Sequence, residues 1–343
     1  MKENKPVWGI VGSGQICHDF CLALRANNST VAFSAASSEA KAKKFSDTHA
    51  IPQHGLFSDL LQSKEVNIVY IGTIHPSHYS QCKQLLSAGF NVLCEKPMAM
   101  NYKETEELVN LAREKKVFLA EGMWTRHFPI TRKIKEVVDS GELGKPLCVT
   151  ADMGFTGPDD MSHRLWDPKL GGGALLDIGC YPLSWVLLAL GIEKFPQVRA
   201  VSKLRNGVDA IGSVSLLYPE AVASASYSIV SVLPETAIIS FENGYIEIQN
   251  SHTPVTARIV NNSDRTTSKD TNFCFPLPSY PENHGELNFP GSEGFLYQVK
   301  EIERCIETSA LETSFFTLDE SLFLAKLMTE IRTQVGVQYD ADN

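Results

Sequence analysis

The stretch VWGIVGSGQIC at residues 7–17 joins an apolar run, a pair of glycines and the start of a helical pattern. The run at 7–11 predicts a strand, and the pattern at 15–25 predicts a helix. A glycine pair between them is typical of dinucleotide sites, because it permits a tight turn and lets a pyrophosphate approach the positive N-terminus of the helix. The alternative is a turn that needs glycine only for its own geometry. The candidate cofactor residues in this stretch are Gly12, Gly14, Gln15 and Ile16.

The first 120 residues continue this alternation of strands and helices. Strands joined by single helices form right-handed crossovers and therefore a parallel, doubly wound sheet. We expect an α/β dinucleotide-binding domain of the Rossmann type over residues 1–122. The further strands are expected at 30–36, 66–72, 91–94 and 117–121, and the helices between them at 39–48, 77–88 and 102–114.

The pattern changes after residue 121. From 197 to 260, strand-like runs follow one another without helices, separated by turn signals such as Asn206-Gly207. Such a series predicts an antiparallel meander. We therefore expect a second, α+β domain over residues 123–343, with a large, mostly antiparallel, open-faced sheet. Its other expected elements are helices at 129–139, 174–190, 294–308 and 318–335, a strand at 147–153 and a polar loop at 261–270.

The composition excludes several classes of protein. The chain has 343 residues, of which 43% are hydrophobic and 21% charged, as in a globular protein of about two domains. A net charge of −9 disfavours binding to nucleic acid, whose phosphates an acidic surface repels. The longest apolar run, at 183–190, is shorter than the roughly 18 residues of a membrane span, so we expect no membrane association.

The cysteines and the N-terminus bear on the compartment. Eight cysteines are spread along the chain without a CxxC pair, which disfavours both a zinc site and a disulfide scaffold. Residues 1–6 lead straight into the first strand and lack the apolar stretch of a signal peptide. We expect a cytoplasmic protein with reduced thiols and no bound metal.

The end of the second strand bears on the choice of cofactor. NAD enzymes usually place Asp or Glu there to bind the ribose 2′-hydroxyl, whereas this strand ends in the run AASS at 35–38. Ser37 and Ser38 can donate to a 2′-phosphate, and Lys41 or Lys43 can neutralise its charge. The sequence therefore favours NADP, with NAD as the alternative.

Two further groups of residues carry chemistry. Glu95-Lys96-Pro97 follows a buried strand, and ligands of open α/β sheets bind beyond the carboxyl ends of the strands. Asp177 and Tyr181 are four residues apart and therefore share one face of an otherwise apolar helix. The structural alternatives are a salt bridge between the lysine and Glu95, and buried hydrogen bonds for Asp177 and Tyr181.

Together these motifs resemble the glucose–fructose oxidoreductase / inositol dehydrogenase (GFO/IDH/MocA) family. The resemblance spans nearly the whole chain, and within the family it is greatest to dimeric dihydrodiol dehydrogenase and D-xylose dehydrogenase. The blocks that carry it are VLCEKPM at 92–98, GMWTRHFP at 122–129 and GGALLDIGCY at 172–181.

The resemblance implies catalytic roles for three residues. Tyr181 would donate and accept the proton, Lys96 would be the catalytic lysine, and Asp177 would orient the substrate hydroxyls. These residue types suit the chemistry, because an alcohol must lose its hydroxyl proton as hydride leaves for the nicotinamide. A nearby ammonium lowers the pKa of a phenol and so makes tyrosine a better base.

The resemblance also implies residues around the cofactor and the substrate. Near residues 250–252, relatives with an aromatic-diol pocket have a tryptophan, whereas this chain has His252. This departure weakens the case for an aromatic dihydrodiol and leaves sugars and other polyols open. The further cofactor residues that it implies are Ile74, His75, His78, Glu95, Lys96 and Trp124. The implied substrate residues are Trp124, Arg126, Phe155, Arg164 and Phe289.

We therefore expect an NADP-dependent dehydrogenase or reductase of a sugar or cyclic diol, which forms a homodimer through its C-terminal sheet. One alternative is a catalytically silent sensor that binds a dinucleotide and regulates a partner protein. Another is an NAD-using glycosidase, or an oxidoreductase that keeps its nicotinamide tightly bound. The intact set of Lys96, Asp177 and Tyr181 favours the enzyme, because a pure sensor has no need for it.

Overall fold

The computed structural model describes residues 5–262, 268–281 and 284–343, and the chain divides into two compact units. The first unit consists of Met1–Ala99, Lys103–His127 and Leu277–Leu318. The second consists of Met100–Tyr102, Phe128–Pro276 and Asp319–Asn343. The segment 277–318 therefore belongs to the first unit although it follows most of the second in the chain. The domain boundary expected between residues 122 and 123 stays a prediction.

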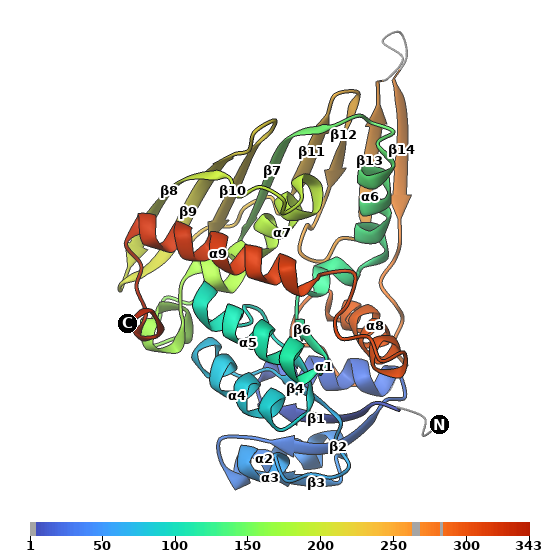
Figure 1. The fold of residues 1–343 in the computed structure, drawn as a ribbon, viewed down its shortest axis with the longest axis vertical. Coiled ribbons are helices and arrows are strands. Elements are labelled where there is room, and N and C mark those ends of the chain that lie inside the picture. Colours follow the sequence, from blue (N-terminus) through green and yellow to red (C-terminus); the bar gives the residue numbers. More distant parts are fainter. Residues whose placement is uncertain (1–4, 263–267, 282–283) are drawn as a thin grey trace. The chain divides into compact units, whose positions relative to one another are not determined.

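The first unit is built on six parallel strands, as the alternation of strands and helices predicts (Figure 1). Their order is β3-β2-β1-β4-β5-β6, so the order reverses between β1 and β4, where open α/β sheets bind their ligands. Sequence analysis missed β3, because Gln-His-Gly has no apolar pattern. The strands are β1 (Val7–Val11), β2 (Thr30–Ala35), β3 (Gln53–Gly55), β4 (Ile68–Ile71), β5 (Asn91–Cys94) and β6 (Leu119–Glu121).

Helices complete the first unit, and their ends follow from the sequence. Gly89, which follows α4, has a φ of +89°, the conformation that glycine adopts most easily after a helix. Ser38 caps α2 by accepting a hydrogen bond from the backbone of Lys41. The helices are α1 (Gln15–Ala26), α2 (Glu39–His49), α3 (Phe57–Leu60), α4 (His75–Ser87), α5 (Tyr102–Lys115) and α8 (Phe295–Glu307), with 3-10 turns at Trp124–His127 and Ser292–Gly294.

The second unit contains an eight-stranded sheet, which confirms the expected mostly antiparallel architecture. Its order is β14-β13-β12-β11-β7-β10-β9-β8, and β7 pairs with β10 in the parallel direction. Of the polar loop expected at 261–270, residues 263–267 lie outside the described residues. The strands are β7 (Pro146–Gly154), β8 (Gln197–Arg205), β9 (Val208–Leu217), β10 (Val222–Ser228), β11 (Ala237–Phe241), β12 (Gly244–Ile248), β13 (Thr256–Asn261) and β14 (Lys269–Cys274).

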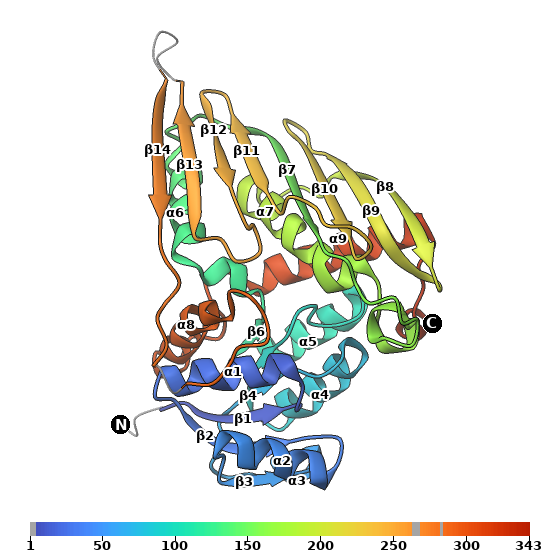
Figure 2. The same ribbon diagram turned by 180° about the vertical axis from the view of Figure 1, so that it is seen from behind.

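Helices α6 and α7 lie on the same face of this sheet in both views (Figures 1 and 2). The inward side chains of the strands are apolar and buried, whereas the other face is not covered by any helix of the described second unit (Figure 2). The helices are α6 (Pro129–Ser140), α7 (Cys180–Leu190) and α9 (Leu318–Val335), with 3-10 turns at Arg164–Trp166, Pro168–Leu170 and Asp340–Asp342.

The helical segment 168–190 is long and apolar enough to cross a membrane by length and composition, which differs from our reading of the sequence. Of its most apolar 18-residue window, however, 94% is buried inside the protein, as in the core helix of a soluble protein. Its apolar character therefore follows from packing against β7, β10 and β11.

The helix expected at 174–190 is not α-helical throughout, because Leu175–Gly179 forms a π turn before α7 begins. Pro182 explains this difference. It has no N–H to donate to the carbonyl four residues earlier, and its ring would clash with that carbonyl in a regular α-helix. A wider turn relieves the clash, and such π turns occur often at functional sites. Asp177 lies in the wide turn, one helical turn before Tyr181.

Candidate active site

The turn after β1 is as tightly packed as its glycines predict. Gly12 has a φ of +119°, and a Cβ there would lie 2.8 Å from the carbonyl oxygen of Gly72, just beyond β4. The thiol of Cys17 donates to that same carbonyl at 3.2 Å. Burial raises the pKa of this thiol to about 12, so it stays protonated at neutral pH. Cys17 therefore packs α1 against the carboxyl ends of the two central strands.

Gly14, the N-cap of α1, is open where Gly12 is crowded. A Cβ on Gly14 would meet nothing within 4 Å, and Ser13, Gly14 and Gln15 are all exposed. Because the N-cap is glycine, no side chain occupies the N–H groups of the first turn of α1. The residues present therefore fit the pyrophosphate of a dinucleotide, which backbone N–H groups and the helix dipole would hold.

A hydroxyl and an ammonium lie together at the carboxyl end of β2. Nζ of Lys41 donates to the exposed hydroxyl of Ser37 at 3.3 Å. The hydroxyl of Ser38 accepts from the backbone N–H of Lys41 at 3.4 Å and serves as the helix cap. The nearby acid, Glu39, lies 3.6 Å from His54. Of the two predicted serines, Ser37 is thus the one whose hydroxyl lies beside a cation.

Lys96 follows β5 and comes directly after a buried carboxyl group. Glu95 accepts a hydrogen bond from the hydroxyl of Tyr70 at 2.9 Å and one from the backbone N–H of Lys96 at 3.3 Å. Burial raises the pKa of Glu95 to about 7, against the opposing effects of Lys96 and Tyr70. The protonation of Glu95 therefore changes near neutral pH, one residue away from Lys96.

His78 links the loop after β4 to the turn that contains Lys96. It is fully buried, with Nδ1 2.8 Å from the carbonyl oxygen of Pro97 and Nε2 3.1 Å from that of Thr73. Burial lowers the pKa of this imidazole. Among the implied cofactor residues of this loop, His75 is also buried, whereas Ile74 is 40% exposed. Ile74 therefore offers the surface that a ligand could contact.

Trp124 and Arg126 pack inside the first unit. The ring of Trp124 lies 4.6 Å from that of Phe295, and the guanidinium of Arg126 lies 5.2 Å from the ring centre of Phe316. Both side chains are almost completely buried. Within this unit, then, they hold the returning segment 277–318 in place.

Phe289 is exposed, and the loop that carries it is anchored on α1. The fully buried carboxylate of Asp19 accepts hydrogen bonds from the backbone N–H groups of Asn288 and Phe289 and from the hydroxyl of Ser292, at 2.7–3.1 Å. The amide of Asn288 also reaches the carbonyl of Gln15, at 3.4 Å. Sequence reasoning missed Asp19, because its partners lie about 270 residues away in the chain.

The second unit brings Asp177, Arg164 and Tyr181 into one region. Nη1 of Arg164 lies 3.0 Å from Oδ1 of Asp177. The carboxylate of Asp177 is almost buried, whereas the guanidinium of Arg164 is half exposed. The arginine therefore compensates the free-energy cost of burying the negative charge of Asp177. Tyr181 follows one turn later on the same helical segment. The helical segment thus carries Asp177, which pairs with Arg164 from an earlier turn of the chain, and then the phenol of Tyr181.

A buried carboxyl group fixes the start of this helix. Asp209 on β9 accepts a hydrogen bond from the N–H of Leu175 at 2.6 Å, and burial raises its pKa to about 7. Gly173 has a φ of +112°, and a Cβ there would lie 2.6 Å from Oδ1 of Asp209. The hydroxyl of Tyr339 donates to the carbonyl of Gly172. The three glycines therefore let the chain approach β9 closely enough for Asp209 to hold the helix that carries Asp177.

Two further side chains lie in the second unit. Phe155 is half-buried directly after β7. The ring of His252 lies 6.1 Å from that of Tyr181, and its Nδ1 lies 3.0 Å from Oε2 of Glu235. Sequence analysis singled out His252 but not Glu235, because no local motif joins the two. Among the described residues, no cluster of three or more His, Cys, Asp or Glu side chains could hold a metal ion.

Comparison with known proteins supports the resemblance seen in the sequence. Residues 7–123 match the GFO/IDH/MocA oxidoreductase family with an NAD-binding Rossmann fold, and residues 131–247 match the GFO/IDH/MocA C-terminal domain. The chain is 36% identical to trans-1,2-dihydrobenzene-1,2-diol dehydrogenase of Danio rerio, over 98% of each chain.

Two solved structures share the fold. One is a 3-ketoreductase from Actinomadura kijaniata in complex with NADP and TDP-benzene, with a TM-score of 0.80, 22% identity, and coverage of 96% of this chain and 98% of that one. The other is levoglucosan dehydrogenase in complex with NADH and levoglucosan, with a TM-score of 0.84, 17% identity, and coverage of 96% and 97%. One of these relatives is bound to NADP and the other to NADH.

Replacing Glu95 by glutamine should remove a pH dependence from the stability. The unfolded carboxyl ionises near pH 4.5 and the folded one near pH 7, so stability present below about pH 4.5 is lost as the pH rises to about 7. The contribution of Glu95 to this loss amounts to about 3 kcal/mol and is absent from Glu95→Gln, whereas the contribution of Asp209 remains in both proteins. Urea unfolding at about pH 5 and pH 8 measures it, with exposed Glu65→Gln as the control. A constant difference between wild type and Glu95→Gln over this range would contradict the assignment.

Proposed function

Because the chain belongs to the GFO/IDH/MocA family of oxidoreductases, we propose that it transfers hydride between NADP and a CH–OH carbon of a sugar or cyclic diol. The observation that supports this best is the position of Asp177, which pairs with Arg164 and lies one helical turn before Tyr181 on the same helical segment. The phenol can exchange a proton, and the ion pair can both donate to and accept from substrate hydroxyls. A silent sensor would need neither.

In the proposed reaction, Tyr181 accepts the hydroxyl proton when the alcohol is oxidised and returns it when the carbonyl is reduced. The nicotinamide, when bound, accepts or supplies the hydride. Lys96 donates a hydrogen bond to the reacting oxygen and stabilises the charge that develops there. Its ammonium also favours the phenolate of Tyr181, since an ordinary tyrosine ionises only near pH 10. Asp177 orients the substrate through its hydroxyl groups.

We propose NADP as the preferred cofactor because Ser37 and Lys41 offer a hydroxyl and an ammonium at the carboxyl end of β2. These are donors suited to a phosphate monoester, whereas a ribose 2′-hydroxyl would need an acceptor. The proposed cofactor residues are Gly12, Gly14, Gln15, Ile16, Ser37, Ser38, Ile74, His75, His78, Glu95, Lys96 and Trp124.

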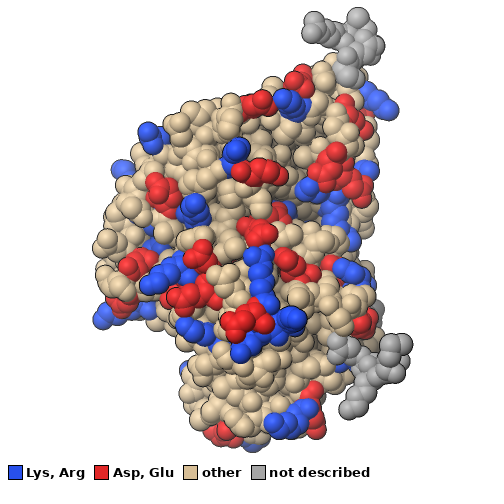
Figure 3. Space-filling view, in the orientation of Figure 1, with Lys and Arg blue, Asp and Glu red and all other residues tan. Residues whose placement is uncertain are grey.

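The proposed substrate is a small polar molecule. The relative from Danio rerio is named for a cyclic dihydrodiol, and levoglucosan dehydrogenase for a sugar derivative. On the face shown in Figure 3, Lys and Arg side chains lie interspersed with Asp and Glu, which suits a small ligand better than a polyanion. The proposed substrate residues are Trp124, Arg126, Phe155, Arg164 and Phe289.

We also propose a cytoplasmic location, which suits eight free cysteines.

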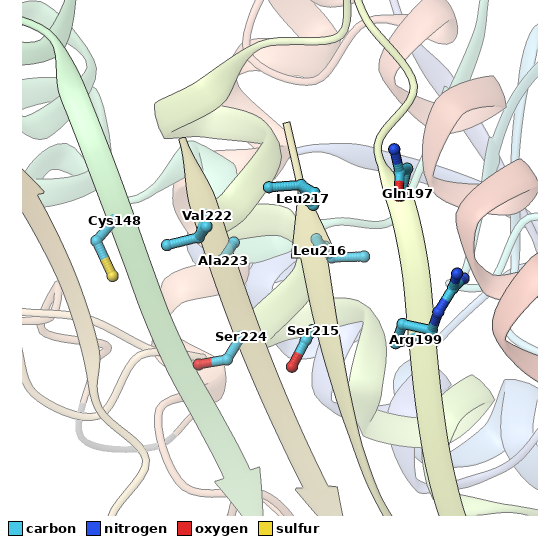
Figure 4. A pocket seen from close by; sticks show the side chains of 9 residues that line it. All are labelled: Cys148, Gln197, Arg199, Ser215, Leu216, Leu217, Val222, Ala223 and Ser224. Atoms are coloured by element: carbon cyan, nitrogen blue, oxygen red, sulfur yellow. The ribbon is translucent and has the colours of Figure 1, made fainter. Parts of the chain in front are cut away.

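We propose that the uncovered face of the eight-stranded sheet joins two copies of the chain. Small polar side chains alternate with buried residues along β10, and Ser226 hydrogen-bonds Ser213 across to β9 at 3.1 Å. Beside them lies a shallow hollow in which Val222 and Leu217 are exposed next to Cys148 (Figure 4). Exposed apolar side chains on a flat sheet face favour packing against a second sheet.

Replacing Lys96 by methionine or Tyr181 by phenylalanine should lower kcat by about 10²–10⁴-fold, because each change removes a proton-transfer or charge-stabilising group. Absorbance of the reduced nicotinamide measures turnover with D-xylose, other aldoses, inositols and trans-dihydrodiols. Fluorescence titration with NADPH should show unchanged affinity in Tyr181→Phe, whose phenol is not among the proposed cofactor residues. Full activity in either variant would refute the residue assignment. Cofactor binding by the wild type without turnover of any substrate would favour the sensor.

Replacing Lys41 by alanine should weaken NADP binding about tenfold to a hundredfold, because one charge-assisted hydrogen bond to the phosphate is lost. NAD binding should not change. Calorimetric titration of both cofactors measures the effect, and Lys44→Ala, which alters an exposed lysine of the same helix, serves as the control. Equal losses for NAD and NADP would speak against a 2′-phosphate at this position.

Replacing Leu217 by arginine should convert a dimer into a monomer, because the charge would have to leave water at the proposed interface. Sedimentation velocity at micromolar concentration should give about twice the mass of 37.9 kDa for the wild type and this single mass for the variant. Leu311→Arg, at an exposed position of the first unit, should remain dimeric. A monomeric wild type would rule out the proposed interface.

A further inference from the structure

A second polar pair, Glu235 and His252, lies beside Tyr181 and has no role in the function proposed above. Nδ1 of His252 lies 3.0 Å from Oε2 of Glu235, and the two side chains are 19% and 23% exposed. The imidazole meets the Tyr181 ring edge-on, with 6.1 Å between the ring centres. The pair is therefore half-buried, in contact with solvent, and adjacent to the candidate proton donor.

The position of His252 is fixed by the same helix that carries Tyr181. Trp185 lies four residues after Tyr181 in α7, so the two side chains share one helix face. The indole N–H of Trp185 donates to the carbonyl of Ser251 at 2.8 Å, and both residues are buried. This bond holds residue 251 one helical turn from Tyr181. Its neighbour His252 is thereby kept beside the phenol.

Glu235 is held in an unusual backbone conformation. Its φ is +57°, and it is the one acidic residue among the described non-glycine residues with a positive φ. This conformation costs of order 1 kcal/mol for a residue with a Cβ. Hydrogen bonds on both sides enforce it, from its N–H to Asp152 at 2.7 Å and from the N–H of Ser251 to its carbonyl at 2.8 Å.

These bonds tie the turn at 234–236 to the turn at 250–253. The second carboxylate oxygen of Asp152 accepts a hydrogen bond from the hydroxyl of Thr236 at 3.1 Å. Both oxygens of Asp152 therefore bind the first turn, one through the backbone N–H of Glu235 and the other through the side chain of Thr236. The carboxylate of Glu235 is thereby aimed at His252. Strain that is maintained in this way is characteristic of sites that bind a ligand.

The charged groups around Tyr181 then form two sets. The first is Asp177, in the π turn before Tyr181, with its partner Arg164. The second is His252, whose ring lies beside that of Tyr181, with its partner Glu235. Each set combines a hydrogen-bond acceptor with a donor. An apolar ring beside Tyr181 would have to displace water from both sets, which is costly unless the lost hydrogen bonds are replaced.

We propose that Glu235 and His252 are specificity-determining residues that bind a third substrate hydroxyl, beyond the reacting hydroxyl and the neighbouring one, so that the preferred substrate is a polyhydroxylated sugar rather than an aromatic-type dihydrodiol. This proposal rests on the proposed function. In this arrangement His252 and Glu235 contact the third hydroxyl, and Arg164 and Asp177 contact the reacting end of the substrate. Tyr181 exchanges the proton with the reacting hydroxyl. A diol with only two hydroxyls has no third hydroxyl for the Glu235–His252 pair to bind.

The test compares kcat/KM for D-xylose and for trans-1,2-dihydrobenzene-1,2-diol in the wild type, His252→Phe and Glu235→Gln. The wild type should prefer the sugar. Each variant should lower kcat/KM for the sugar about tenfold or more, mainly through KM, while kcat/KM for the diol changes less than about twofold. Glu220→Gln, which removes a carboxylate from the exposed pair with Lys145 in the same unit, should leave both values unchanged.

An unchanged ratio of the two kcat/KM values in His252→Phe and Glu235→Gln would overturn the proposal, and so would equal losses for both substrates. Circular dichroism and thermal unfolding verify that the variants fold. If the wild type turns over neither these compounds nor the other aldoses and inositols, the proposed function fails by that result. Calorimetric titration with D-xylose in the presence of NADPH then tests the present proposal by itself. Sugar binding to the wild type that is lost in His252→Phe supports the proposal. Sugar binding that persists in His252→Phe, or no binding to the wild type, overturns it.

Discussion

A carboxyl group that leaves water must find donors inside the protein, and this requirement shapes both units. Asp19 on α1 is satisfied by backbone N–H groups of a segment that arrives about 270 residues later. Asp209 accepts a hydrogen bond from the N–H of Leu175 at the start of the helix that carries Asp177, and Asp177 in turn is compensated by Arg164. Glu95 receives the hydroxyl of Tyr70. Each of these acids fixes the position of a segment with a proposed role in binding or catalysis. Because a buried carboxyl group is unfavourable without donors, the segments that supply the donors are held in defined positions.

The parallel sheet, the antiparallel sheet and most helix boundaries could be predicted from the sequence, because each depends on local patterns of apolar residues, glycines and caps. The same holds for Gly12, Gly14 and Lys96, which stand at the ends of strands. Other features depend on residues that are distant in the chain. The residues next to Glu235 in the sequence do not predict its positive φ, because the residues that hold it there are Asp152 and Ser251. The π turn before α7 results from Pro182, in a run whose pattern otherwise predicts a continuous α-helix.

The two units offer different chemistry. The first provides backbone N–H groups at an uncapped helix start, a cation at the end of β2 and a lysine beside an acid of raised pKa. The second provides a phenol that has the Glu235–His252 pair beside its ring and the Arg164–Asp177 pair one helical turn earlier. This division agrees with a family that has an NAD-binding Rossmann fold followed by a separate C-terminal domain. The binding groups of the first unit are mostly backbone atoms, which many sequences can supply, whereas those of the second are side chains and can change by single substitutions.

The anchoring of residues 288–292 on Asp19 also has a consequence for the order in which the protein is made. The first unit contains Leu277–Leu318, and 149 residues of the second unit separate this segment from His127. At roughly 5–20 residues per second, a ribosome needs about 7–30 s to synthesise that interval. During this time α1 has emerged with a carboxylate whose partners do not yet exist, and the face of α1 that α8 later covers is exposed. The first unit can therefore reach its final structure only when nearly the whole chain has left the ribosome.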